Sequence, residues 1–563
     1  MQRRPDLVAA VLIVGLVLAV YAGSLSNGPV WDDRSLVTEN PYLRSIDGLG
    51  TLLKNDLWTA SEKREPSSFY RPLTMVSFWV NTQIAGQSAA AARAGNILFH
   101  AANAVLLLLL LRRLLEPPRM LLATSFAAIW AVMAVNSEPV LWISGRFDPM
   151  TAMAALACML SNRLSGWRRL VLVVVFAACG LLSKEAFMGW LPLLLLDDLL
   201  LLRRSLRDIV PKYASLAALI GVNLALRSWV EIPSLSVISA TGVSTLVESY
   251  LFTVATLVPR AIVPLRLDPF HPYVPLPLGV AVLVACFLCL VTIWLAWRAL
   301  RRNAREPSRL AAFGWCWLLL GLFPASLTGP HLFMIGDRYA YLPTIGLIIM
   351  GYAGLSPALT SLEGRWGSRA SDVVGAALAF VTAGQAWALL ERCPDWRDDR
   401  TLVEASVRAH PANPYALYSL GTMALNDNDL QSAESLLLQA AKGNPKSWRT
   451  PNAICVLRLR QGRLEEARAA CDQSIERNPD NPRVWVNAAS VEVNRKNWPV
   501  ARSEALRAVA LKPQFAEAHY LVAVSAANLG RMDEARAHLG AGLAEDPTHV
   551  GLVNLQRQMD SRR

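Results

Sequence analysis

A small set of ionisable side chains interrupts the apolar stretches of this 563-residue chain, and their types indicate acid–base and anion-binding chemistry. The acids are Asp32, Asp33, Glu138 and Asp148, and the cations are Arg71, Arg146, Lys184 and Arg338. A carboxylate can accept the proton of a hydroxyl group, and a guanidinium or ammonium group can hold a phosphate. This set could therefore bind an anionic, lipid-linked donor and activate a hydroxyl acceptor.

Each of these side chains also has a structural interpretation. The adjacent acids Asp32 and Asp33 could cap a helix, form a salt bridge or bind a cation. Arg71 could lie at a membrane interface with its charge in water. Lys184 and its neighbour Glu185 could form a structural ion pair. From the sequence alone these alternatives stay open.

A polar stripe adds one more candidate. Arg93, Asn96, His100 and Asn103 follow one another at intervals of three, four and three, so they share a helix face. In an apolar span such a face meets protein or a water-filled cavity. We therefore expect His100 to contribute to substrate binding.

The elements that must position these residues are membrane helices. The chain is 53% hydrophobic and only 17% charged, and apolar runs recur through residues 1–390. Many approach the roughly 20 residues that cross a bilayer. The runs cover about 7–25, 95–111, 120–135, 149–162, 170–182, 186–202, 209–226, 246–265, 277–297, 310–327, 339–357 and 371–390. We predict an all-α, multi-pass integral membrane domain over 1–390.

Clusters of Arg and Lys predict the orientation of these spans, because positive residues concentrate in cytoplasmic loops. The clusters begin at Arg3, Arg112, Arg163, Arg203, Arg298 and Arg365. The connections between them then face outward, and these are 27–94, 136–148, 183–185, 328–338 and everything after 391. The candidate side chains thus share one side of the membrane. The net charge of +12 is explained by the cytoplasmic loops, so we expect no nucleic-acid partner.

One run does not fit the alternation. A full span at 246–265 would connect the wrong sides, and it contains Pro259, Arg260 and Pro264. We predict that it is re-entrant or lies on the outer surface, which leaves about eleven spans. Re-entrant backbone needs a protein-lined cavity, so this segment also points to a site.

The tail repeats with a period of 34 residues. Pro411, Pro445, Pro479, Pro513 and Pro547 keep this spacing, as do Ala433, Ala467, Ala501 and Ala535 and the turn residues Asn428, Gly462, Lys496 and Gly530. The pattern resembles the tetratricopeptide (TPR) repeat, an α-solenoid of helix pairs. We predict a TPR domain over 396–563, with four repeats in 412–547 and capping helices on both sides.

The eight cysteines show no spacing typical of a disulfide framework. Cys286 and Cys289 form a CxxC inside an apolar run, which favours helix packing over a redox motif. We therefore expect no disulfide framework.

The motifs together resemble a known family. Their order is Trp31-Asp32-Asp33, then Tyr70-Arg71-Pro72-Leu73-Thr74, then Ser137-Glu138-Pro139-Val140 and Ser144-Gly145-Arg146-Phe147-Asp148-Pro149, then Ser183-Lys184-Glu185, then Asp337-Arg338-Tyr339-Ala340-Tyr341, and finally the repeats. This series is similar to the transmembrane and TPR repeat-containing protein O-mannosyltransferases, which belong to the GT-C class of glycosyltransferases.

The resemblance implies transfer of a sugar, expected to be mannose, from a polyprenyl- or dolichyl-phosphate donor to Ser or Thr of extracytoplasmic proteins. It implies a base at Asp32 or Asp33. It also implies phosphate- or substrate-binding roles for Arg71, Arg146, Lys184, Arg338, Glu138, Asp148 and His100. The TPR groove would hold the acceptor polypeptide. No cofactor is firmly implied, although a divalent metal is compatible, and composition favours a bacterial inner membrane. A non-catalytic membrane-anchored TPR scaffold, or a polysaccharide or lipid ligase or transporter, is the alternative.

Overall fold

The computed structural model describes residues 3–60, 67–116, 119–232, 242–301, 303, 305–327 and 334–561. Within this part the only strands are the antiparallel pair β1 (His271–Pro272) and β2 (Met334–Ile335), and the rest of the regular structure is helical. The predicted all-α class is confirmed. Of the predicted outer turn 328–338, residues 328–333 lie outside the described part. The contacts divide the chain into two compact units, Met1–Ala409 and His410–Arg563.

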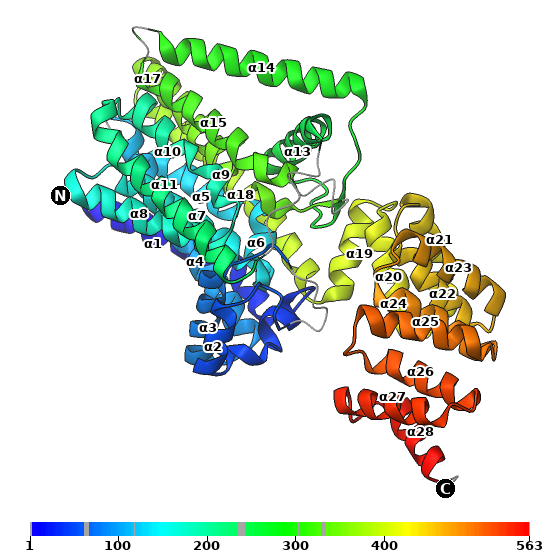
Figure 1. The fold of residues 1–563 in the computed structure, drawn as a ribbon. Helices are drawn as coiled ribbons and strands as arrows, with labels where there is room; N and C mark the ends of the chain where they lie inside the picture. Colours follow the sequence, from blue (N-terminus) through cyan, green and yellow to red (C-terminus); the bar gives the residue numbers. More distant parts are fainter. Residues whose placement is uncertain are drawn as a thin grey trace. The chain divides into compact units, whose positions relative to one another are not determined.

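The first unit is a helical bundle (Figure 1). Its main helices are α1 (Arg3–Tyr21), α4 (Ala89–Leu114), α5 (Met120–Val132), α7 (Phe147–Ser161), α8 (Gly166–Ser183), α11 (Leu206–Trp229), α13 (Val243–Ile262), α14 (Leu278–Leu300), α15 (Glu306–Ser326), α17 (Thr344–Trp366), α18 (Arg369–Arg392) and α19 (Asp399–Ala409). Large apolar side chains on α14 are exposed, for example Leu278 at 81% and Leu283 at 71%. An exposed helix that is apolar all round fits a lipid environment.

Fewer helices meet the requirements of a simple span than the sequence predicts. Eight described helices are long and apolar enough to cross a membrane, or nine if the bent pair 120–132 and 134–141 counts as one. Two of the eleven expected spans are therefore absent from this group. Helix α7 has only 15 residues, and run 186–202 is broken into α9 (Phe187–Trp190), α10 (Pro192–Leu196) and the π-helical η6 (Asp197–Leu201).

Helix α13 covers the run that breaks the alternation. It is one continuous helix of 20 residues, so the irregular backbone expected of a re-entrant segment is not found there. It is not among the described candidate spans. Figure 1 shows it nearly end-on, whereas α14 and α15 run across the view. This orientation is compatible with the other alternative, a helix on the outer surface, which stays a prediction.

Ion pairs show which helix ends lie together at the same end of the bundle. Arg112, at the end of α4, forms an ion pair with Asp6 at the start of α1. Arg119 pairs with Glu363 of α17 at 2.7 Å. These contacts put positive clusters that are far apart in the sequence at common ends of the bundle, as a shared membrane side requires.

The first long connection folds into a small helical cap. It contains η2 (Arg34–Thr38), η3 (Pro41–Leu43), α2 (Ile46–Leu53) and α3 (Pro72–Ala85). Its core includes Leu43, Leu52 and Phe78, and Ile143 from a later turn packs in the same cluster. Burial of Ile143 there brings the two turns together, because apolar side chains gain free energy by leaving water.

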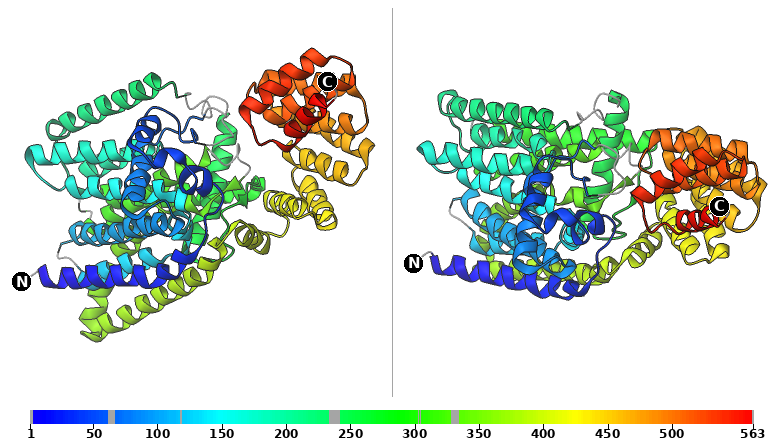
Figure 2. Two further views of the ribbon diagram at one scale, coloured as in Figure 1. Left: turned by 90° about the horizontal axis from the view of Figure 1, so that it is seen from below. Right: turned by 60° about the horizontal axis from the view of Figure 1, so that its bottom comes forward.

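The second unit is a succession of helix pairs, drawn from yellow to red in Figure 2. The pairs are α20 (Pro414–Asn426) with α21 (Leu430–Gly443), α22 (Arg449–Arg460) with α23 (Leu464–Arg477), α24 (Pro482–Asn494) with α25 (Trp498–Leu511), and α26 (Ala516–Asn528) with α27 (Met532–Glu545), followed by α28 (Val550–Asp560). The four alanines of the 34-residue period are completely buried. A small side chain at this position lets the paired helices approach closely.

The turns inside the repeats explain four residues of the periodic pattern. Asn428, Gly462, Lys496 and Gly530 all have positive φ, between 60° and 76°. This left-handed conformation ends a helix, and glycine and asparagine adopt it most easily. The period therefore marks a required backbone conformation at each turn.

One pair of cysteines forms a disulfide that the spacing of the eight cysteines did not predict. Cys455 of α22 and Cys471 of α23 form a disulfide within the second repeat and are 16 positions apart in the sequence. Their spacing resembles no small disulfide scaffold. Antiparallel pairing of the two helices nevertheless places them face to face, with both side chains completely buried.

Candidate active site

The adjacent acids of the first turn have different environments. Asp33 is completely buried, and its carboxylate accepts hydrogen bonds from the backbone N–H groups of Val30 at 3.0 Å and Ser144 at 2.8 Å. Burial raises the pKa of Asp33 to about 6, although these hydrogen bonds oppose the shift. Asp32 is only partly buried. Asp33 thus anchors the loop, and Asp32 is the acid that a substrate can approach more easily.

Trp31 connects this loop to a cation. Its φ is +54°, a conformation that costs a bulky residue free energy and must be held by its surroundings. Its ring stacks on Trp142 with centroids 5.0 Å apart, and the Arg338 guanidinium lies 5.6 Å from its centre. Its backbone N–H donates to Asp399 at 2.6 Å. These contacts put Trp31, the residue before the Asp32–Asp33 pair, beside Arg338.

Arg338 is held by Glu138. Its guanidinium forms an ion pair with Glu138, and its backbone N–H donates to the same carboxylate at 2.8 Å. Burial alone would lower the pKa of Arg338, but the negative charge of Glu138 raises it above the ordinary value. Glu138 lies on α6 (Ser137–Leu141) and Arg338 on the 3-10 helix η7 (Asp337–Ala340). The pair therefore joins two predicted outer turns and keeps Arg338 charged.

Lys184 and Asp148 form a second pair of the same kind. Lys184 follows α8, and Asp148 lies in the first turn of α7. The Lys184 ammonium is 5.3 Å from the centre of the Tyr339 ring, and the Arg338 guanidinium is 4.8 Å from the same ring. One tyrosine thus separates the two cations.

Both cations line one cavity. Its empty space measures about 450 Å³ with open solvent included, and its charged lining residues are Asp148, Lys184 and Arg338. The rest of the lining is mostly apolar and includes Trp190, Leu320, Gly321, Pro324, Ala325, Leu342 and Pro343. A cavity lined by two cations with their carboxylate partners and by apolar side chains offers contacts for a molecule that carries both a phosphate and a hydrocarbon chain.

Arg71 lies next to this group. It pairs with Glu185 at 3.0 Å, and its guanidinium is 4.2 Å from the centre of the Phe147 ring. Lys184 lies 4.9 Å from the same ring. Glu185 therefore pairs with Arg71 from a distant part of the sequence, whereas Lys184 pairs with Asp148.

Two of the predicted site residues have structural positions instead. Arg146 is completely buried and donates from all its nitrogens to Asn96, Ser77, Asn81 and Ala92. It joins α3, α4 and the 3-10 helix η5 (Ile143–Arg146), and no N–H is left for a phosphate. We therefore correct its predicted donor-binding role.

His100 is likewise corrected. Its ring nitrogens meet the Tyr341 hydroxyl at 2.7 Å and the Ala131 carbonyl oxygen at 2.8 Å. It is completely buried within the bundle and is absent from the cavity lining. The predicted polar stripe does lie on one helix face, but this histidine uses its ring to connect helices of the bundle.

The sequence interpretation missed a fourth charged pair. Arg260 of α13 contacts Asp337 at 3.3 Å, and the backbone N–H of Asp268 donates to Asp337 at 2.7 Å. Burial raises the pKa of Asp337. An arginine inside the apolar run 246–265 was the available signal. This pair places the end of α13 next to Arg338.

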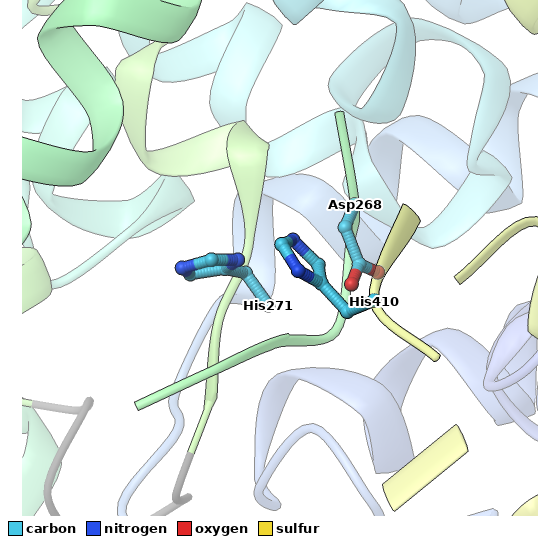
Figure 3. A group of neighbouring side chains, drawn as sticks. All are labelled: Asp268, His271 and His410. Atoms are coloured by element: carbon cyan, nitrogen blue, oxygen red, sulfur yellow. The ribbon is translucent and has the colours of Figure 1, made fainter. Parts of the chain in front are cut away.

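Asp268 and His271, shown in Figure 3, have side chains of types that bind divalent metals. Asp268 already accepts a hydrogen bond from the Phe270 N–H at 2.9 Å. The Arg260 guanidinium lies 2.7 Å from Nδ1 of His271, so a positive charge occupies the position next to that nitrogen. At Nδ1 of His271 this positive charge opposes a metal ion.

Comparisons with known proteins agree with the motifs. The family described as tetratricopeptide repeat matches residues 395–447, 456–514 and 486–550. Protein O-mannosyl-transferase TMTC3 from Homo sapiens is 23% identical over 77% of this chain and 51% of its own length. TMTC3 from Mus musculus is 24% identical over 90% of this chain and 60% of its own. Protein O-mannosyl-transferase F38B6.6 from Caenorhabditis elegans is 22% identical over 77% and 62%.

The chain is a relative of the protein O-mannosyl-transferases. The resemblance predicted from the motifs is thus confirmed, together with membrane helices and TPR repeats. The chain spans 51–62% of the length of these protein O-mannosyl-transferases. Among solved structures, a thermophilic TPR protein of Thermus thermophilus, TTC0263, aligns with 32% of this chain and 94% of its own at 20% identity and a TM-score of 0.26.

Proposed function

We propose that this chain is a membrane-bound protein O-mannosyltransferase. It transfers mannose from a polyprenyl-phosphate donor to Ser or Thr hydroxyl groups of extracytoplasmic proteins. One observation carries the proposal: the cavity lined by Lys184 and Arg338 adjoins the Trp31–Asp33 loop through the Arg338 and Trp31 contact. This contact supports a donor site that adjoins the loop carrying the proposed base.

The donor phosphate binds against Lys184 and Arg338. Their carboxylate partners Asp148 and Glu138 hold them in position, so little reorganisation is needed when negative charge develops on the leaving phosphate. The apolar wall with Trp190 and Pro324 accommodates the first part of the hydrocarbon chain. Arg71, held by Glu185, is close enough to add to the positive potential.

Asp32 acts as the general base. Its carboxylate takes the proton of the acceptor hydroxyl while the hydroxyl oxygen bonds to the anomeric carbon. The bond from that carbon to the phosphate oxygen breaks, and polyprenyl phosphate leaves with the electron pair. A single in-line displacement inverts the anomeric centre. Asp33, with both oxygens bonded to backbone N–H groups, is a positioning residue for Asp32.

The site and the repeats face the non-cytoplasmic side, in a bacterial inner membrane. The Arg clusters support this orientation by the positive-inside rule. The buried disulfide Cys455–Cys471 gives independent support, since disulfides persist in oxidising compartments. The TPR unit then lies on the side where acceptor polypeptides are found.

The proposal is tested with the purified full chain in detergent. Labelled polyprenyl-phosphate mannose and a Ser/Thr-rich peptide are incubated with it, and label on the peptide is measured. Transfer to the peptide is expected. Transfer to a polysaccharide alone would indicate a ligase, and release of label without an acceptor product would contradict the proposed reaction. If the chain is a non-catalytic scaffold, the labelled donor should remain intact.

A further inference from the structure

Two arginines occupy equivalent positions in successive TPR repeats. Arg449 begins α22, Arg483 lies in the first turn of α24, and they are 34 residues apart. Both side chains are exposed. The first helices of successive repeats contact one another, so equivalent residues form a row along one face of the unit.

This row contains further groups that can bind a peptide. The charges of Arg449 and Arg483 both act on the Tyr418 hydroxyl of α20, which places the three side chains in one region of the surface. Beside them, Nδ2 of Asn487 donates to Oδ1 of Asn452 at 2.8 Å across α22 and α24. Each amide keeps further donor and acceptor capacity.

The arginines of this row differ from others in the unit. Arg458, Arg468 and Arg502 each pair with a carboxylate at 2.6–2.7 Å. For Arg449 and Arg483 no carboxylate of the described residues lies within ion-pair distance. Glu517, the equivalent residue of the next repeat, has its carboxylate 2.7 Å from Nε2 of His549. The row therefore carries uncompensated positive charge over the second and third repeats.

We propose that this face binds an acidic, extended polypeptide segment. Carboxylates of the segment pair with Arg449 and Arg483, and its backbone amides hydrogen-bond to Asn452 and Asn487. Arginine binds carboxylates in a bidentate manner. Because Arg449 and Arg483 lie one repeat apart, they favour a segment whose two acidic residues are not adjacent in its sequence. The inference rests on the proposed function only where it identifies this segment as part of the acceptor protein.

Fluorescence anisotropy with the full chain in detergent tests the binding. The probe is a labelled peptide rich in Asp, Glu and Ser, compared with its Asn/Gln counterpart. The acidic peptide should bind more tightly, and added salt should weaken it. Replacement of both arginines, Arg449→Ala with Arg483→Ala, should weaken binding by about tenfold, since charge-assisted contacts are lost.

The matched control replaces Arg477 and Arg507 by Ala, which removes the same charge from exposed positions on the second helices α23 and α25. This control should bind as the wild type does. Charge reversal, Arg449→Glu with Arg483→Glu, should create binding of a Lys-rich peptide, a gain that misfolding cannot produce. Equal binding of both peptides, or equal loss in the control, would overturn the inference. Asp32→Asn should leave peptide binding unchanged, so failure of catalysis is distinguishable from failure of binding.

Discussion

The backbone N–H of Ser144 donates to Oδ1 of the buried Asp33 at 2.8 Å. This hydrogen bond joins the first and second outer turns, which are more than a hundred residues apart in the sequence. It holds the loop that carries Asp32 against the turn that leads to Asp148. Much of the proposed site therefore depends on one carboxylate that does not touch substrate.

Removal of this carboxylate should destabilise the protein. Asp33→Ala leaves the N–H groups of Val30 and Ser144 without their acceptor, at a cost of about 1–3 kcal/mol for each buried group. Thermal unfolding in detergent measures this loss. Asp47→Ala is the control, because Asp47 is an exposed acid of the same loop. Equal unfolding temperatures for the two variants would contradict the anchoring role.

Asp33 should also make stability depend on pH. Burial raises its folded-state pKa from 3.8 to about 6, so the folded protein holds this proton more tightly than the unfolded chain. The contribution of Asp33 to the unfolding free energy is thus present at low pH and is lost as the pH rises through about 6, by up to about 3 kcal/mol. The stability of wild type relative to Asp33→Asn should fall between pH 4 and pH 7. A constant difference would show that Asp33 does not titrate there.

Lys184 and Arg146 should respond differently to substitution. Lys184→Gln removes a cation from the cavity wall and should raise KM for the donor about ten- to hundredfold. Arg146→Ala should lower the unfolding temperature, because several buried acceptors lose their donor. Steady-state kinetics at varied donor concentration, together with thermal unfolding, separate these effects. A selective increase of donor KM in Arg146→Ala would return that residue to the donor site.

The disulfide should protect its two cysteines from alkylation and should stabilise the TPR unit. Cys455 and Cys471 should resist alkylation in intact cells until a reductant is added, which mass spectrometry of the peptides detects. Replacement of both by Ala should lower TPR stability by about 3 kcal/mol, as expected for a loop of this length. Free thiols at both positions in freshly prepared protein would contradict the proposed oxidising side.

Periodic features were predictable because each position has one local physical requirement. The 34-residue spacing of Pro445 and Ala433 reports helix ends and close packing, and it located the repeats. Apolar length located most spans, since a bilayer demands it. Apolar length was a poor guide where a helix is shorter, as in α7, or broken, as in run 186–202.

The clustering of charged residues was predictable in type and only partly in membership. Charged residues at the outer ends of spans are costly, so Arg338, Lys184 and Asp148 were good candidates. Arg146 has the same sequence signature, yet its acceptors come from α3 and α4, which no local pattern reveals. The pairing of Arg71 with Glu185 likewise depends on tertiary contacts.

The central claim is that Asp32 is the base beside a phosphate site formed by Lys184 and Arg338. The most direct measurement is the rate of mannose transfer to a Ser/Thr peptide by Asp32→Asn, with Asp47→Asn as the matched control. Loss of a general base should lower kcat by about 10²- to 10⁴-fold while donor binding persists, and the control should retain the wild-type rate. Transfer by Asp32→Asn at the wild-type rate would contradict the account.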